Sequence, residues 1–128
     1  MTKLNVLRKE LDEATRRLNE VLQQPKTDIT RDSAIKRFEL AFDLSWKVIK
    51  AYLETQGVSC TSPLGCFKEA YRQKLIEFDE VWVQLTETRN KTVHTYDEQL
   101  ADEVYARLPG ARDAFRRISA GIPADSKE

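Results

Sequence analysis

The chain has 128 residues, 41% of them hydrophobic and 33% charged, so it is long enough for one domain with a single core and too apolar for a disordered tail. Its 21 basic and 21 acidic residues cancel, which excludes a strong overall field for phosphate and leaves nucleic-acid binding to a local basic patch. The sequence contains no apolar run long enough to predict a transmembrane helix, and the charged N-terminus lacks the apolar stretch of a signal peptide. We therefore expect a cytoplasmic protein with no membrane partner.

Two long helices are predicted in the first half of the chain. Leucines and valines at steps of three and four indicate a helix over residues 3–24, which Pro25 ends. A second helix is expected from about Thr30 to Gln56, followed by Gly57 as its terminating glycine. Its apolar stripe is the widest in the chain, so this helix should be the most buried; the stripe holds Ile35, Phe38, Phe42, Trp46, Ile49 and Leu53.

A short third helix is predicted after the dipeptide Ser62-Pro63, which is typical of an N-cap followed by proline at the first helical position. We expect it to run to about Leu75, with Phe67, Ala70, Tyr71 and Leu75 facing inward. Cys60 and Cys66 lie six residues apart, which is not a metal or thioredoxin spacing. In a reducing cytoplasm they are expected as two partly buried thiols, with a disulfide as the less favoured alternative.

The second half predicts two further helices around a turn. The fourth helix should begin near Asp79, bury Trp82 and end near Asn90 or Lys91, since the residues at 92–96 include three weak helix formers. Asp97 is a suitable N-cap for a fifth helix, which Pro109-Gly110 should kink or break before helical spacing resumes over 111–118. The fold class predicted is all-α, a four- to five-helix up-down bundle, with one domain over residues 1–120 and a frayed tail over 121–128.

The stretch TRNKTVHTYDE, residues 88–98, holds the one histidine of the chain. A histidine side chain can exchange a proton near neutral pH, and the guanidinium fork of Arg89 suits a phosphate. Asn90 can position groups without charge. This combination fits metal-independent RNA cleavage, in which His94 activates a ribose 2′-hydroxyl or protonates the leaving oxygen and Arg89 stabilises charge on the phosphorus.

A simpler interpretation of the same stretch stays open. A lone histidine beside a helix end is more often structural than catalytic, and Tyr96 alone would be a packing aromatic. Lys91 is most simply a solvated charge, although it could contact a phosphate. No cluster of acidic or histidine residues predicts a metal site, and no cofactor is expected.

The segment from Arg89 to Tyr96, RNKTVHTY, resembles the R-x4-H-x-Y form of the HEPN family motif. The flanking segments FELAFDLSWKVIKAYLETQGV, SPLGCFKEAYRQKLI and VWVQLTETRNKTVHTYDEQLADEVYARLP are similar to the branch of nucleotidyltransferase substrate-binding proteins. The resemblance covers about residues 4–118. It implies a small helical bundle that forms a homodimer, with the two motifs facing each other across a cleft.

The resemblance also implies a partner and a role for each motif residue. This branch is typically encoded beside a minimal nucleotidyltransferase (MNT), and HepT-like members of toxin–antitoxin pairs are ribonuclease toxins. The antitoxin transfers AMP to the motif tyrosine. Carried over, Arg89 and His94 would be catalytic with support from Asn90, and Tyr96 would be the AMPylation acceptor. A bulky anion two residues from His94 would block the cleft and repel RNA.

Two other functions use the same residues. The older interpretation of this branch is a non-catalytic substrate-binding subunit that completes a two-component nucleotidyltransferase and binds a nucleotide phosphate. A plain helical interaction module would be favoured if Arg89 and His94 were buried and satisfied by each other. A dimer in which Arg89, Lys91 and His94 of both chains face each other would give a basic cleft on a neutral protein.

Overall fold

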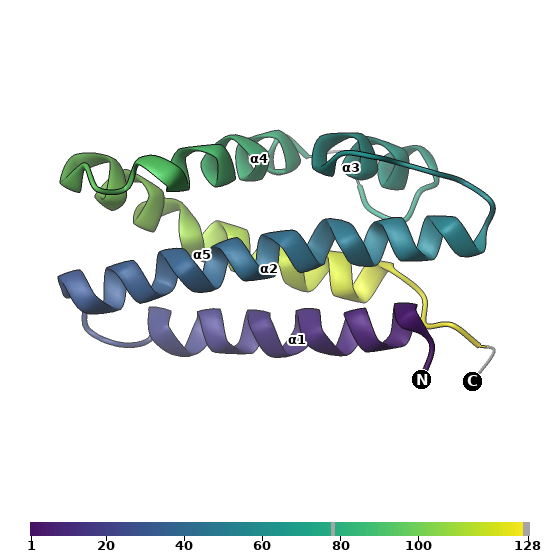
Figure 1. The fold of residues 1–128 in the computed structure, drawn as a ribbon, viewed down its shortest axis with the longest axis horizontal. Helices are drawn as coiled ribbons and strands as arrows, with labels where there is room; N and C mark the ends of the chain where they lie inside the picture. Colours follow the sequence, from purple (N-terminus) through teal and green to yellow (C-terminus); the bar gives the residue numbers. More distant parts are fainter. Residues whose placement is uncertain (78, 127–128) are drawn as a thin grey trace.

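The protein is all-helical in the computed structural model, which describes residues 1–77 and 79–126 (Figure 1). No strand occurs in these ranges, so the predicted all-α class is confirmed. The helices are α1 (Lys3–Leu22), α2 (Asp28–Thr55), α3 (Pro63–Arg72), α4 (Val81–Lys91), the short 3₁₀ helix η1 (Thr92–His94) and α5 (Glu98–Gly121). None of the described helices combines the length and the apolar character that a membrane span requires.

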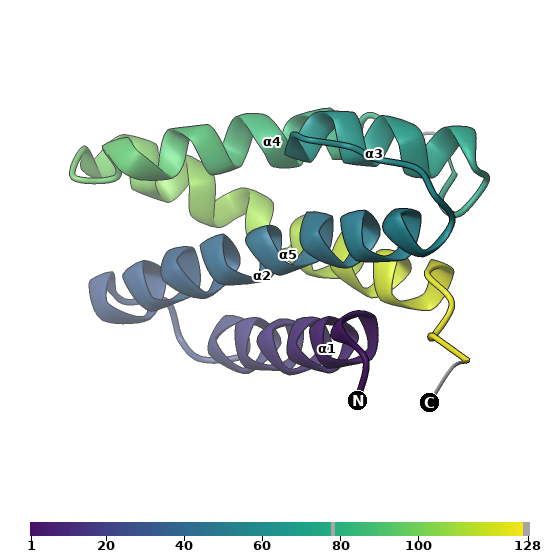
Figure 2. The same ribbon diagram turned by 45° about the vertical axis from the view of Figure 1, so that its right-hand side comes forward.

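The longest helix, α2, is the centre of the bundle and contacts α1, α3, α4 and α5. In Figures 1 and 2, α1 lies along one side of α2, while α3 and α4 follow each other along the opposite side. Helix α5 returns behind α2 and contacts α1 and α4. The N-terminus and the end of α5 lie at one end of the bundle, and the turn between α4 and α5 lies at the other (Figure 1).

A chain of aromatic rings joins four of the helices through α2. Phe38 and Phe42 lie one turn apart on α2, with 6.0 Å between the ring centroids of Phe38 and Phe115 of α5. Phe42 contacts Phe67 of α3, which stacks on Trp82 of α4 with centroids 5.7 Å apart. All five rings are buried. Because each buried ring contributes about 1.5–3 kcal/mol, this row fixes α3, α4 and α5 against α2. Trp46, also predicted as core, is only partly buried.

Capping residues set the helix ends close to the predicted positions. Thr27 caps α2 and exchanges hydrogen bonds with Thr30, so the helix begins two residues before the predicted start. The Ser62 hydroxyl accepts a hydrogen bond from the Gly65 amide at the start of α3, as predicted. After α2 the chain turns at Gly57 with φ of 75°, a left-handed conformation that favours glycine.

Of the two outcomes predicted at Pro109-Gly110, a kink or a break, the break is wrong, because α5 continues through both residues. Proline in a helix interior costs about 3 kcal/mol. Both residues are exposed, whereas Leu108 and Ala111 on either side are buried. The apolar face of α5 therefore stays packed across the proline, and this packing offsets its local cost.

Three predictions around α3 are also corrected. The helix ends at Arg72, three residues early, and Lys74 then adopts φ of 61°. Tyr71 is exposed rather than inward-facing. Cys60 and Cys66 form a disulfide with Cα atoms 5.2 Å apart, so the predicted pair of free thiols is wrong. The N-terminal turn of α3 brings the two cysteines together, which a spacing of six residues alone does not reveal.

Much of the expected tail is packed against α1. Ile122 is buried, and its carbonyl accepts a hydrogen bond from the Arg8 guanidinium. The Asn5 side chain donates to the Asp125 carbonyl at 3.1 Å and accepts from the Asp125 amide at 2.9 Å. Through residue 125 this segment is therefore held rather than frayed, and residues 127–128 lie outside the described part of the chain.

Candidate functional site

The motif residues lie where α4 tightens into η1. Thr92 forms two hydrogen bonds with Arg89: its hydroxyl donates to the Arg89 carbonyl at 2.7 Å and accepts from the Arg89 guanidinium at 2.9 Å. The Thr95 hydroxyl donates to the Thr92 carbonyl at 2.9 Å. Asp97 then caps α5 by accepting from two backbone amides. The threonines thus satisfy backbone groups that a continuing helix would use, which ends α4 where the sequence predicted.

Arg89 is directed towards α2. Its Nη1 lies 3.5 Å from Glu39 Oε2, and its Nε lies 3.6 Å from Asp43 Oδ1. The side chain is 26% exposed. Nε itself is buried and has no hydrogen-bond partner, since the Asp43 oxygen is at ion-pair rather than hydrogen-bond distance. The guanidinium is therefore held by charge between two carboxylates, with part of its edge open to a ligand.

His94 and Tyr96 are presented to solvent at the end of the bundle. His94 is exposed, and Tyr96 is 84% exposed. Their ring centroids are 6.1 Å apart with the planes at 81°, an edge-to-face contact. Asn90 is exposed and Lys91 is half-buried. A phenol that projects this far is accessible to a modifying enzyme.

The structure brings the predicted site residues together only in part. Arg89 pairs with Thr92 and His94 contacts Tyr96, but in the described ranges no hydrogen bond or ring contact joins Arg89 to His94. An exposed His94 without Arg89 as its partner does not meet the condition set for a purely structural motif. Asn90 likewise makes no side-chain hydrogen bond within the described residues.

The sequence interpretation missed Glu39 and Asp43. They lie four residues apart on α2 and so share a face of that helix. The signal was a pair of acidic residues interrupting the most apolar helix of the chain. Their partner could not be named from the sequence, because Arg89 is 46 positions beyond Asp43 and reaches it only through the packing of α4 on α2.

A buried arginine fixes the other side of the motif turn. Arg31 of α2 is 3% exposed, and its Nη1 donates to Glu98 at 2.7 Å and to Asp102 at 3.2 Å, both in α5. Hydrogen bonds to Glu98 first, and to Asp32 second, raise the pKa of Arg31 above its ordinary value. Hydrogen bonds from Lys26 first, and from Arg31 second, lower the pKa of Asp102. Because this cluster ties the start of α5 to α2, it limits where η1 can lie.

Comparison with known proteins identifies a family for this chain. The family described as "Nucleotidyltransferase substrate binding protein like" matches residues 4–121. A Haemophilus influenzae protein named "Probable ribonuclease HepT" is 36% identical over an alignment of 81 residues, covering 59% of this chain and 55% of the relative. The chain thus spans about half the length of this curated relative.

Two solved structures have the same arrangement of helices. A crystal structure of a Thermus thermophilus protein superposes with a TM-score of 0.82 at 30% identity, covering 89% of this chain and 99% of that one. A Haemophilus influenzae structure, described as the fold of a substrate-binding domain of a nucleotidyltransferase, gives a TM-score of 0.70 at 26% identity and covers 93% and 96% of the two chains. By its sequence and its fold, the chain belongs to the nucleotidyltransferase substrate-binding protein family.

Proposed function

We propose that the chain is a metal-independent endoribonuclease toxin of the HEPN type. In this proposal it acts in the cytoplasm as a homodimer and is neutralised by a minimal nucleotidyltransferase that AMPylates Tyr96. The observation that carries the proposal is the exposed His94–Tyr96 pair on the same short turn that begins at the partly open guanidinium of Arg89. The 36% identical relative, which is named a probable ribonuclease, supports it.

The chemistry needs no group beyond this set of residues and the RNA itself. His94 takes the proton of a ribose 2′-hydroxyl, the 2′-oxygen forms a bond to the adjacent phosphorus, and the bond to the 5′-oxygen of the next nucleotide breaks. A proton returned to that 5′-oxygen completes the transfer and leaves a cyclic phosphate and a 5′-hydroxyl. Arg89 stabilises the extra negative charge on the phosphoryl oxygens.

The geometry of a single chain gives a structural reason for dimerisation. Arg89 faces α2, whereas His94 projects from the end of the bundle, and no hydrogen bond or ring contact links them in the part of the chain described. A second copy facing the motif would supply an arginine and a histidine from the opposite side of the substrate. The homodimer expected from the family resemblance would therefore complete the site.

The proposal is tested by expressing the wild-type chain and His94→Ala, each without a partner, and following growth and total RNA. Only the wild type should arrest growth and degrade RNA, and the purified proteins should differ in the same way on ordinary RNA in the presence of EDTA. Lys68→Ala, at an exposed residue of α3 outside the motif, is a control that should behave like the wild type. Cleavage of RNA by His94→Ala at the wild-type rate would contradict the mechanism.

A non-catalytic substrate-binding subunit is the second candidate. It is favoured by the description of the 26% identical structure and by the two carboxylates that already neutralise Arg89. In this role the chain would bind a nucleotide or the nucleotidyltransferase without cleaving RNA. Healthy growth of cells at verified wild-type expression, together with nucleotide binding that survives His94→Ala, would favour this function over the ribonuclease.

A further inference from the structure

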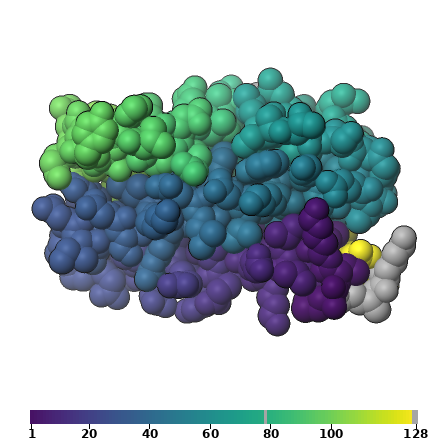
Figure 3. All heavy atoms as spheres, in the orientation of Figure 1, coloured from purple at the N-terminus to yellow at the C-terminus, as the bar shows by residue number. Residues whose placement is uncertain are grey.

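A groove crosses the outer face of α2 between α1 and α4. Its volume is about 510 Å³, and Arg89 forms part of its wall. Figure 3 shows this face, with α1, α2 and the α4–η1 region side by side. The polar and charged residues that line the groove are Arg17, Ser33, Lys36, Arg37, Glu39, Asp43 and Arg89. The groove therefore leads along α2 into the candidate site, although the motif supplies only one of its residues.

The charges of the groove are unevenly paired. Both carboxylates, Glu39 and Asp43, interact with Arg89. Arg37 donates to a carbonyl of α1 at 2.7 Å and is partly exposed. Arg17 and Lys36 are exposed, and neither has a carboxylate of another described residue within ion-pair distance. Arg17 interacts electrostatically with Glu13, one turn earlier on α1. Two cations thus remain available to an external anion beside the site.

The shape of the groove fits an extended ligand. Seven residues separate Lys36 from Asp43, so these positions are about 10 Å apart along the axis of α2. That length corresponds to about three nucleotides of a stacked strand. The cations lie around this one groove on three helices, with Arg17 on α1, Lys36 on α2 and Arg89 on α4. A single groove of this length suits one phosphate backbone.

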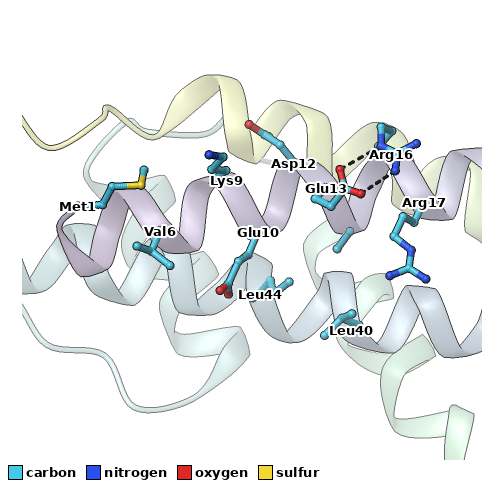
Figure 4. Close-up of a pocket in the computed structure, with 11 residues that line it drawn as sticks. Met1, Val6, Lys9, Glu10, Asp12, Glu13, Arg16, Arg17, Leu40 and Leu44 are labelled. Atoms are coloured by element: carbon cyan, nitrogen blue, oxygen red, sulfur yellow. Dashed lines mark hydrogen bonds and ion pairs between the residues drawn. The ribbon is translucent and has the colours of Figure 1, made fainter.

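An apolar surface continues the groove along α1. Leu40 is 52% exposed and lines both this groove and a neighbouring one of about 830 Å³. Figure 4 shows Arg17 and Leu40 at one end of the neighbouring groove, with Met1 and Val6 at the other. An exposed leucine between cations offers a face on which a base can rest while its phosphates meet Arg17 and Lys36.

From this arrangement we infer that the groove binds the phosphate backbone of a single-stranded RNA and guides the strand to Arg89. Arg17 and Lys36 contact phosphates away from the cleaved bond, and Arg89 contacts the phosphate nearest the motif. The choice of RNA as the anion rests on the proposed ribonuclease function. The groove and its exposed cations do not depend on it.

The experiment measures binding without cleavage. A fluorescent 2′-O-methyl oligouridine, which lacks the 2′-hydroxyl needed for cleavage, is titrated with the wild type, Arg17→Gln and Lys36→Gln over a series of salt concentrations. Each variant should weaken binding about fivefold and reduce the slope of log Kd against log salt by about 0.7, the value for one lost phosphate contact on a single strand. Lys68→Gln removes an exposed lysine of α3 that has no ion pair among the described residues, and it should match the wild type.

The outcomes separate the groove from the catalytic proposal. Three results would each contradict RNA binding in the groove. Lys68→Gln could lose as much affinity as Lys36→Gln, the slopes of log Kd against log salt could stay unchanged, or the wild type could fail to bind the strand. Variants that change the sedimentation of the protein and not its RNA binding would assign this face to contacts between copies and also overturn it. If binding follows the predicted slopes but the protein does not cleave ordinary RNA, the result would support RNA binding in the groove and contradict the proposed ribonuclease function.

Discussion

Arg89 and Asp43 form an ion pair across the contact between α4 and α2, with 3.6 Å between Nε and Oδ1. Glu39, one turn earlier on α2, adds a second carboxylate 3.5 Å from Nη1. The arginine of the motif is thus oriented before any substrate arrives, but a phosphate must compete with two negative charges for it. The pair sets both the position and the accessible charge of the site.

Removing one of these carboxylate charges should strengthen the binding of phosphate. Asp43→Asn keeps the shape of the side chain and removes its charge, so the Kd for a non-cleavable RNA should fall about two- to fivefold, a change of at most about 1 kcal/mol because the pair is partly exposed. Fluorescence anisotropy with the 2′-O-methyl strand measures this. Asp113→Asn on α5 is the control. Weaker binding by Asp43→Asn would show that the carboxylate is needed chiefly to hold Arg89 in place.

The cluster around Arg31 should make stability depend on acid. The pKa of Asp102 is lowered from its ordinary value of 3.8 by Lys26 and Arg31, which means that the folded state favours the ionised carboxylate. The stabilisation from this carboxylate is therefore complete above about pH 5 and is lost as the pH falls through 3.8 and then through the lower pKa of the folded state.

Asp102→Asn tests this dependence. Its midpoint of thermal unfolding should lie below that of the wild type near about pH 7. The difference should shrink as the pH falls through 3.8 and towards the lower pKa of the folded state, where the wild-type carboxylate becomes protonated as well. Glu103→Gln, the next residue on α5, is exposed and should show no such convergence. A difference for Asp102→Asn that stays constant over this range would mean that the carboxylate contributes through packing rather than through its charge.

Periodicity and capping residues predicted most of the fold. The apolar stripe that includes Phe38, Phe42 and Ile49 identified the most buried helix, and Ser62 and Asp97 marked the starts of α3 and α5. These signals work because the free energies involved are local: a cap satisfies amides within the next turn, and a stripe reflects one buried face.

The remaining features depend on contacts between distant segments. The sequence placed Arg89 at a helix end but could not reveal Glu39 or Asp43 as its partners, since that requires the packing of α4 on α2. The same limit applies to Pro109, whose local cost is offset by burial on both sides. Local signals predict where elements end, whereas the electrostatic surroundings of the site come from tertiary packing.

Because α5 is continuous, we expect Gly110 to lower the stability of this helix at a position where the backbone does not require glycine. A Cβ added there would meet no atom within 4 Å, so Gly110→Ala should raise the free energy of unfolding by about 0.5–1 kcal/mol through better helix propensity. Gly57→Ala, at φ of 75°, should instead lower it by about 1 kcal/mol. Urea denaturation measures both. Destabilisation by Gly110→Ala would argue that the helix is interrupted at Pro109-Gly110.

Tyr96 provides the most direct test of regulation by a nucleotidyltransferase. Tyr96→Phe removes the phenolic oxygen but keeps the ring that contacts His94, so it should preserve RNA cleavage and lose the site of modification. The wild type, incubated with ATP and the minimal nucleotidyltransferase proposed as its partner, should gain the mass of AMP and lose activity, while Tyr96→Phe should do neither. Tyr71→Phe, at an exposed tyrosine of α3, should be modified and inactivated like the wild type. Tyr96 is 84% exposed, so burial would not explain a failure to modify the wild type. Such a failure would therefore contradict AMPylation as the means of control.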